Sequence, residues 1–311
     1  MDDPQQLKAL FADLPPTPQD DGPNPLVPIA YPSSYVTLMS LFRSVCQKLE
    51  YSSRAIQLTS LILPLNPGHY TVWKHRLDCV LHLGLDAGTL CSELEFVELM
   101  CTDNLKCYQV WHHRQALISQ ASSGVANPQS YTSEIAFVDR MLTLDSKNYH
   151  AWAYRQFLVQ KFKMFRNEMT DSEIWIRADV RNNSAWNQRY FCLNMLKNQH
   201  ESSNAQNEAN ESELFDFVKE VSVVEGYINQ APNNQAPWNY LAGIKTLSSK
   251  VSTESIIKQT NQIIETLVLD LLSISTPAKV MHLSILAANK SHKLYQHVFF
   301  FNADMQRSAN G

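Results

Sequence analysis

The sequence predicts an all-α fold, a right-handed α-α superhelix in which helical hairpins repeat to form a crescent-shaped solenoid. The first observation is a recurring segment in which a tryptophan follows a polar turn. The second is spacing: the tryptophans of these segments are 38, 41, 34 and 52 residues apart, and a period of 34 to about 41 residues is typical of helical-hairpin arrays. The third is composition, because 8 glycines in 311 residues and 44% hydrophobic content suit a mostly helical protein. The tryptophans are Trp73, Trp111, Trp152, Trp186 and Trp238.

Each copy of the segment has the same physical logic. A polar residue precedes the tryptophan and can cap the coming helix by accepting a hydrogen bond from a free amide. The tryptophan fills the seam between neighbouring hairpins, and an arginine follows one turn later on the same face. Because one hairpin cannot bury its apolar faces alone, several must stack. We therefore interpret these residues as core packing and structural ion pairs rather than chemistry. The arginines are Arg76, Arg114, Arg155 and Arg189, and the fifth copy has Leu241 instead.

The chain begins with a proline-rich stretch, residues 1–32, which predicts an extended arm laid on a surface or left disordered. A repeat domain is expected over residues 33–272. Its first helices run near 33–48 and 52–63, and a turn at 64–68 leads into the helix of Trp73. The later pairs join 90–101, 134–144, 167–178 and 214–228 to the helices of the remaining four tryptophans, in that order.

Two polar segments lengthen the steps between repeats. The loop at 121–128 explains the 41-residue step, and a stretch at 198–213 almost without large apolar residues predicts a solvated insertion. Beyond residue 252 the sequence is apolar and helical in pattern but lacks another tryptophan copy. Residues 273–311 are therefore assigned to a divergent C-terminal tail, which contains Phe299-Phe300-Phe301.

Charge and cysteine content exclude several classes of protein. The net charge of −4 gives no electrostatic reason to bind nucleic acid, and no apolar run reaches the roughly 18 residues of a membrane-spanning helix. The acidic, polar start Met1-Asp2-Asp3 is unlike a secretory signal. Six cysteines without a CxxC pair suit a reducing cytoplasm. His112 and His113 point apart on a helix, and we expect no metal site in this chain.

The arm and the repeats together resemble the α subunit of protein farnesyltransferase and type I geranylgeranyltransferase, within the protein prenyltransferase α-repeat family. The resemblance covers roughly residues 10–245 and fades after about 250. Generic helical arrays share the period but not the Asn-Tyr-x-x-Trp-x-x-Arg pattern. The segments that carry it are 18–25 (Pro-Gln-Asp-Asp-Gly-Pro-Asn-Pro), 66–76, 106–114, 147–156 and 179–191.

The resemblance implies an enzyme subunit that is active only with a partner. The family's α subunit wraps around a β subunit, an α–α barrel that holds the catalytic zinc and the prenyl pocket. The enzyme transfers a farnesyl or geranylgeranyl group from its diphosphate to a cysteine thiol in the C-terminal CaaX box of acceptors such as small GTPases. Magnesium accompanies the diphosphate in farnesyl transfer. Negative charge builds on the leaving diphosphate, so a cation held there lowers the barrier.

The same resemblance assigns residues to the rim of the site. Lys106 matches the family's diphosphate-contacting lysine, and a lysine beside a helix N-terminus is a poor choice for stability alone. Gln109 matches the residue that contacts the acceptor's terminal carboxylate. Tyr108, Tyr149 and His150 match further rim residues that bind substrate.

Cys107 stands where the family usually has asparagine. We expect it to be a tolerated substitution, with Leu105 or Asn104 adjusting the turn.

Two other functions stay open from the sequence. One is a non-catalytic helical-repeat scaffold that binds a protein partner on its concave face. The other is the α subunit of the Rab-specific geranylgeranyltransferase, which carries comparable repeats. The Gln-Asp-Asp-Gly-Pro arm and the absence of added domains favour the CaaX class. The choice between farnesyl and geranylgeranyl belongs to the β pocket, outside this chain.

Overall fold

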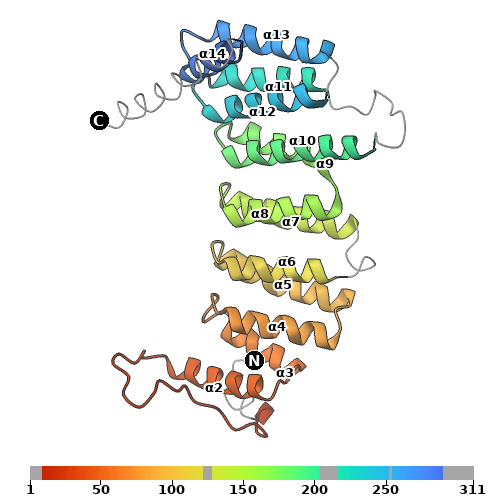
Figure 1. The fold of residues 1–311 in the computed structure, drawn as a ribbon. Coiled ribbons are helices and arrows are strands. Elements are labelled where there is room, and N and C mark those ends of the chain that lie inside the picture. Colours follow the sequence, from red (N-terminus) through yellow and green to blue (C-terminus); the bar gives the residue numbers. More distant parts are fainter. Residues whose placement is uncertain (1–8, 122–127, 204–215, 252–253, 290–311) are drawn as a thin grey trace. The chain divides into compact units, whose positions relative to one another are not determined.

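The computed structural model describes residues 9–121, 128–203, 216–251 and 254–289 of the chain. Every labelled element in these ranges is an α-helix, which confirms the predicted all-α class (Figure 1). The chain divides into two compact units, Met1–Phe162 and Lys163–Gly311. None of the described helices is both long enough and apolar enough to cross a bilayer.

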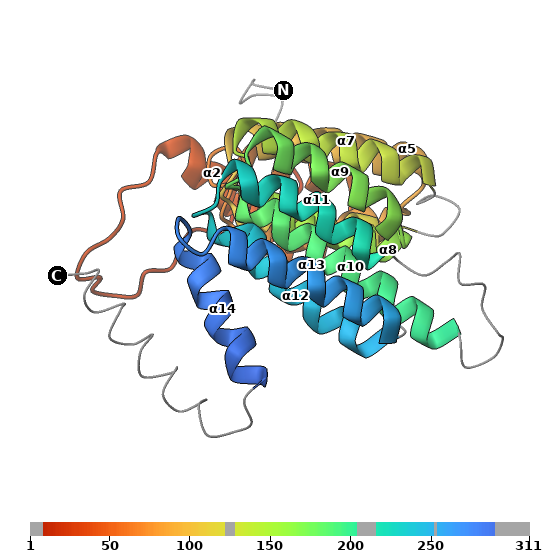
Figure 2. The same cartoon turned by 90° about the horizontal axis from the view of Figure 1, so that it is seen from above.

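The first unit is a stack of helical hairpins in chain order. Helix α2 packs against α3, and the pairs α3–α4, α5–α6 and α7–α8 are the hairpins. The second helices α4, α6 and α8 lie side by side in one layer, and α5 packs against α7 in the other, so that α5 and α7 overlie one another in Figure 2. The helices are α2 (Ser33–Gln47), α3 (Ser53–Ile62), α4 (Tyr70–Leu83), α5 (Ala87–Asp103), α6 (Tyr108–Gln120), α7 (Pro128–Leu144) and α8 (Tyr149–Phe162).

The N-terminal arm lies partly on this unit. Phe11 and Leu14 are buried, and the Arg54 guanidinium donates to the Asp13 carboxylate (Nη1–Oδ1 2.6 Å). Farther along, the arm is extended and Leu26 is 99% exposed. The first half of the described arm is therefore laid on a surface, as the proline content suggested, whereas the second half projects into solvent. Residues 1–8 fall outside the described ranges.

The second unit repeats the same arrangement. The hairpins are α9–α10, α11–α12 and α13–α14, with α10, α12 and α14 packed in one layer and α11 against α13 in the other. Its helices are α9 (Phe165–Ala178), α10 (Asn183–Ser203), α11 (Phe217–Gln230), α12 (Gln235–Val251), α13 (Glu254–Asp270) and α14 (Thr276–Asn289). Helix α10 continues to Ser203, so the first residues of the predicted insertion are helical; residues 204–213 are outside the described ranges.

The repeat pattern continues past the predicted boundary at residue 272. Helix α14 packs on α12 and α13, and runs obliquely to them in Figure 2. The hydroxyl of Ser275 accepts from the Ala278 amide and thereby caps α14 (3.1 Å). Residues 273–289 thus complete a hairpin rather than begin a tail. The triple phenylalanine at 299–301 lies outside the described residues.

A hydrogen bond from each motif tryptophan closes the turn before its helix. The indole N–H donates to the carbonyl of the residue six positions earlier, at 2.7 to 2.9 Å in all five copies. The acceptors, from first to last copy, are Pro67, Leu105, Ser146, Val180 and Pro232. All five tryptophans are buried, so the indole fills the seam and also satisfies a turn carbonyl.

The next hairpin often supplies a second donor to the same carbonyl. Asn148 donates from Nδ2 to the Leu105 oxygen (3.0 Å) and Asn234 donates to the Val180 oxygen (2.7 Å). The Ser275 hydroxyl donates to the Pro232 oxygen (2.6 Å) in the same way. Asn148 also accepts from the Ala151 amide and so caps its own helix (3.0 Å). Each of these side chains therefore starts a helix and joins it to the hairpin before.

The motif arginines hold the two layers together through buried ion pairs. Arg76 pairs with Glu93 (Nη2–Oε1 2.8 Å), Arg114 with Glu134 (2.6 Å) and Arg189 with Glu220 (Nε–Oε1 2.6 Å), and each of these pairs is buried on both sides. Arg155 is fully buried and donates to the Asp139 carboxylate (2.6 Å). These contacts run from the second helix of a hairpin to the opposite layer.

Candidate functional site

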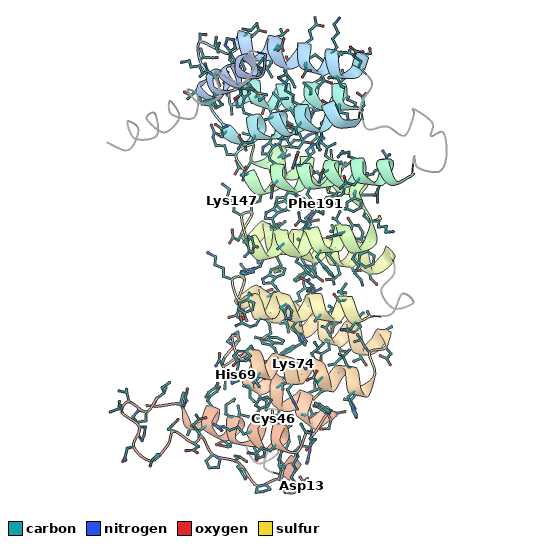
Figure 3. The ribbon with its side chains drawn as sticks, viewed as in Figure 1. Asp13, Cys46, His69, Lys74, Lys147 and Phe191 are labelled. Carbon is teal, nitrogen blue, oxygen red and sulfur yellow. The ribbon has the colours of Figure 1, made fainter. Side chains whose placement is uncertain are left out.

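The candidate site lies where the second helices of the first unit begin. Helices α4, α6 and α8 lie side by side, and all three start at the same end of the stack. In Figure 3, His69 and Lys147 mark this turn end, while Lys74 lies farther along α4. Because helix N-termini carry partial positive charge, this end of the unit favours anionic groups.

A row of exposed tyrosines marks these three helix starts. Tyr70, Tyr108 and Tyr149 are the first residues of α4, α6 and α8, and their exposed fractions are 71%, 58% and 78%. Large exposed aromatic side chains in such a row are typical of a binding surface. The sequence assigned Tyr108 and Tyr149 to the rim but missed Tyr70, although the His69-Tyr70 pair of the first copy has the same place before its tryptophan.

Lys106 lies in the turn just before α6. It is exposed and makes no ion pair within the described part of the chain. The neighbouring Leu105 carbonyl accepts from both Trp111 (2.9 Å) and Asn148 (3.0 Å), so the backbone of this turn is held from two sides. A lone lysine on a fixed turn beside a positive helix end is a cation available for an anionic ligand.

A cleft of about 400 Å³ separates α4 from α6 next to this turn. Tyr108 and Gln109, two of the rim residues expected from the resemblance, line it together with Lys74 and His112, which sequence reasoning did not select. Tyr70, Trp73, Leu77 and His113 complete the lining. The cleft therefore combines aromatic walls with several polar groups at its edge, which is typical of a small ligand site.

Tyr149 and His150 lie one hairpin farther along, at the start of α8. Their rings are edge to face with centroids 5.6 Å apart, and neither lines the cleft between α4 and α6. The predicted rim residues therefore form two neighbouring groups, one on α6 and one on α8. The contact of Asn148 with the Leu105 carbonyl joins the two turns that carry them.

The turn around Cys107 does not show the adjustment that the sequence suggested. Its thiol lies 3.3 Å from the Pro67 carbonyl oxygen and 3.1 Å from Oε1 of Gln109. Leu105 keeps the role that the corresponding residues have in the other turns, so no local adjustment is needed. The thiol itself makes the contact with the preceding hairpin that an asparagine makes elsewhere.

A buried polar group extends each of two arginine–glutamate pairs. The Tyr154 hydroxyl donates to Glu134 (2.6 Å), and the Tyr240 hydroxyl donates to Glu220 (2.7 Å). Burial raises the pKa of both tyrosines, and the adjacent carboxylates raise it further, so both stay protonated as donors.

Histidine replaces tyrosine in the first of these clusters. Nε2 of His113 is 3.6 Å from the Glu93 carboxylate that Arg76 also binds. Burial lowers the pKa of His113, in spite of the opposing pull of Glu93. Burial alone would raise the pKa of Glu93, but the neighbouring His113 ring and the charge of Arg76 outweigh it and lower that pKa. These buried clusters are scaffold, not reaction chemistry.

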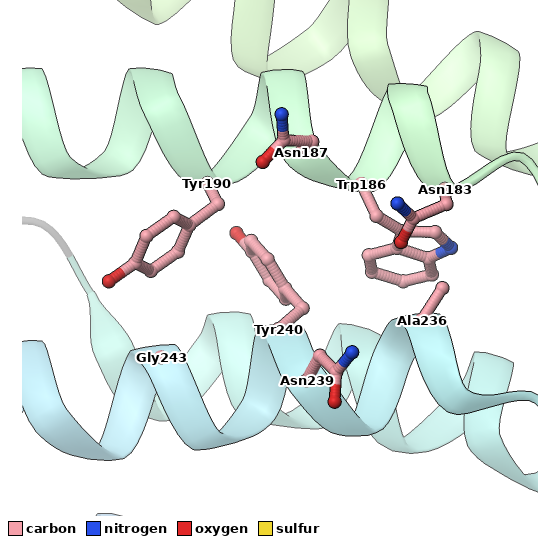
Figure 4. A pocket seen from close by; sticks show the side chains of 8 residues that line it. All are labelled: Asn183, Trp186, Asn187, Tyr190, Ala236, Asn239, Tyr240 and Gly243. Carbon is pink, nitrogen blue, oxygen red and sulfur yellow. The ribbon is translucent and has the colours of Figure 1, made fainter. Parts of the chain in front are cut away.

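A second groove, of about 360 Å³, lies between α10 and α12 in the other unit (Figure 4). Asparagine side chains and two tyrosines dominate its lining, and the Tyr190 and Tyr240 rings meet edge to face inside it (centroids 6.2 Å apart). Gly243 leaves room for Tyr190, because a Cβ at that position would lie 2.4 Å from the ring carbon Cε2. No rim residue was predicted here.

Stacked helical hairpins with indole-closed turns define an α-helical repeat protein, here with aromatic and cationic side chains along one edge. A family model described as the protein prenyltransferase alpha subunit repeat matches residues 52–83, 90–121, 131–162 and 165–196. The farnesyltransferase/geranylgeranyltransferase type-1 subunit alpha of Pisum sativum is 38% identical over 247 residues, 78% of this chain and 67% of the relative. The chain therefore belongs to the α-subunit family of protein prenyltransferases.

Two further comparisons agree with this assignment. The subunit of the same name from Schizosaccharomyces pombe is 43% identical over 109 residues, and that match spans 35% of this chain and about a third, 36%, of the yeast protein. A solved structure of Candida albicans protein geranylgeranyltransferase-I complexed with GGPP has a TM-score of 0.72 and 27% identity. That likeness covers 93% of this chain and 91% of the solved one.

Proposed function

We propose that this chain is the α subunit of a heterodimeric CaaX protein prenyltransferase of the cytoplasm. The β subunit of farnesyltransferase or of type I geranylgeranyltransferase would be its partner. The heterodimer transfers a farnesyl or geranylgeranyl group to the C-terminal cysteine of an acceptor protein. Membership of the α-subunit family supports this proposal, and so does the rim formed by the exposed Lys106 and Tyr108 and the half-buried Gln109.

The observation that carries the proposal is the environment of Lys106. In the transfer, the acceptor thiolate forms a C–S bond to the prenyl carbon while the C–O bond to diphosphate breaks. Negative charge grows on the departing diphosphate. In this proposal the Lys106 ammonium, next to the N-terminus of α6, donates a hydrogen bond to an oxygen of the departing diphosphate. This interaction stabilises the transition state more than the ground state.

The metals of the reaction would come from outside this chain. No group of three or more histidine, cysteine, aspartate or glutamate side chains in the described ranges could hold a metal ion. In this proposal the β subunit holds the zinc that activates the acceptor thiol, and magnesium arrives with the prenyl diphosphate. This chain contributes cationic and hydrogen-bonding groups at the rim.

Substitution of Lys106 tests the proposal. The chain is co-expressed with each β subunit, and transfer of both prenyl groups to a CaaX peptide is measured. We expect Lys106→Ala to lower kcat about a hundredfold, the usual effect of losing one charge-stabilising donor, while the heterodimer still forms. Lys147→Ala is the matched control, since Lys147 precedes the equivalent turn residue in the next hairpin. Unchanged turnover in Lys106→Ala, or an equal loss in the control, would contradict the role of Lys106.

A further inference from the structure

In two of the repeats, the turn residue four positions before the motif tryptophan has the same two tasks. Asn148 and Asn234 donate to a carbonyl of the preceding hairpin and accept from an amide of their own helix. Cys107 occupies this position before Trp111. Its side chain makes no capping hydrogen bond to α6, so the thiol has given up one of the two tasks. What it does instead distinguishes this turn from the turns of Asn148 and Asn234.

The thiol connects the turn to the side chain of Gln109. Sγ lies 3.1 Å from Oε1 of Gln109 and 3.3 Å from the Pro67 oxygen, so the S–H hydrogen is placed between two acceptors. On its other side, Gln109 donates from Nε2 to the Gly68 carbonyl (3.0 Å). The Gln109 carboxamide is thus held at both ends, with a donor at its oxygen and an acceptor at its nitrogen.

These two neighbours decide which way the amide faces. A carbonyl can accept but not donate, so the Gly68 oxygen requires the NH₂ group of Gln109 on its side. The thiol, whose single proton lies between the two acceptors, then meets the amide oxygen. The NH₂ group has a second hydrogen, and Gln109 lines the cleft between α4 and α6. The fixed orientation therefore leaves one N–H free for a ligand with an acceptor group.

We propose that Cys107 is a positioning residue that orients the Gln109 carboxamide toward the carboxylate of the acceptor's C-terminus. This inference rests on the proposed function, and it concerns how that function is served by a side chain that touches no substrate. Removing the thiol takes away one of the two contacts that hold the amide, and the N–H that meets the carboxylate is then less well preorganised.

The test uses the heterodimer with its β subunit and two forms of one CaaX peptide. One peptide ends in a free carboxylate and its KM is measured; the other ends in a carboxamide and its inhibition constant is measured. We expect Cys107→Ala to raise the KM of the carboxylate peptide about fivefold, the worth of one hydrogen bond, without changing kcat. Cys107→Ser keeps a donor and should stay close to the unsubstituted heterodimer. The inhibition constant of the carboxamide peptide should not change in either variant.

Two further variants separate positioning from a general loosening of the turn. Gln109→Ala should raise the same KM, and adding Cys107→Ala to it should have no further effect, because the thiol acts through Gln109. Asn148→Ala is the matched control: it removes the same kind of turn contact one hairpin away and should not discriminate between the two peptides.

Each negative result points to a different failure. If the unsubstituted heterodimer transfers no prenyl group, the proposed function fails and the role of Cys107 falls with it. If the heterodimer is active but Cys107→Ala leaves the KM unchanged, or weakens both peptides equally, the positioning role alone is overturned. Additive effects of the Cys107 and Gln109 substitutions would also overturn it.

Discussion

The buried cluster of Arg114, Glu134 and Tyr154 offers a quantitative test of how the array is held together. Two guanidinium nitrogens of Arg114 donate to Glu134 (2.7 and 2.6 Å), and a third donates to the Leu94 carbonyl (2.9 Å). The Tyr154 hydroxyl also donates to Glu134 (2.6 Å). Glu134→Leu would leave the buried guanidinium with the single Leu94 carbonyl and leave the tyrosine hydroxyl without its acceptor.

The expected cost of Glu134→Leu follows from that geometry. Removing one partner of a buried ion pair typically lowers the free energy of unfolding by about 3–5 kcal/mol. Adding Arg114→Met should recover most of this loss, because a buried pair can often be replaced by apolar residues at little cost. The orphaned Tyr154 hydroxyl should then account for about 1–3 kcal/mol, which adding Tyr154→Phe should recover.

Urea-induced unfolding of the full chain measures these values. Tryptophan fluorescence is a suitable signal, because the Trp111 ring lies 5.9 Å from that of Tyr154. The expected order of stability is the single variant lowest, the double variant higher and the triple variant near the unsubstituted protein. A single variant that loses less than about 1 kcal/mol, or a triple variant as unstable as the single one, would refute the assignment of this cluster as a coupled buried unit.

Two more predictions concern stability. Burial lowers the pKa of His113 below its usual 6.5, so the unfolded chain binds the proton more readily and stability falls as pH drops through that value. His113→Tyr, which copies the tyrosine of the sister clusters, should flatten this part of the pH profile of unfolding; parallel profiles would contradict the prediction. Gly243→Ala should destabilise the protein because its Cβ would meet the Tyr190 ring at 2.4 Å, but should be harmless or stabilising when combined with Tyr190→Ala. Thermal unfolding of the two Gly243→Ala proteins compares them, and equal shifts in both backgrounds would argue against the clash.

The repeating tryptophans made the helical hairpins predictable, but the partners of the arginines were not. Glu93, Glu134 and Glu220 follow their arginines by 17, 20 and 31 residues, because the connections between hairpins differ in length. Because a connection of variable length separates each arginine from its acidic partner, the partner has no fixed position in the sequence pattern. The acidic partners therefore emerge only when the layers are packed.

The last hairpin was missed for a related reason. Ser275 takes the place of Asn234, and Lys279 stands four residues after it, where Trp238 stands after Asn234. Within residues 254–289, α14 packs against α12 and α13, and no later hairpin is described that a tryptophan could face. The search for tryptophan could not find a repeat that lies at the end of the described array.

The site was predictable in part. The family resemblance selected the turn residues Lys106, Tyr108 and Gln109, and two of them line the cleft. Cys107 was not recognised as a contact residue, since the carbonyl that it meets lies 40 residues earlier in the chain. The cleft lining from α4 could not be read from the α6 motif because it depends on how adjacent hairpins pack.

The turn carbonyls that accept two hydrogen bonds have a mechanical consequence. Within each unit, a tryptophan and a side chain of the following hairpin donate hydrogen bonds to the same turn carbonyl oxygen. Adjacent hairpins are therefore linked at the end of the stack where these turns lie. When a unit bends, adjacent hairpins should therefore separate mainly at the end opposite these turns. The spacing between Lys106 and Tyr149 would stay constant while the unit flexes. The rim groups would therefore keep fixed separations within an otherwise flexible helical array.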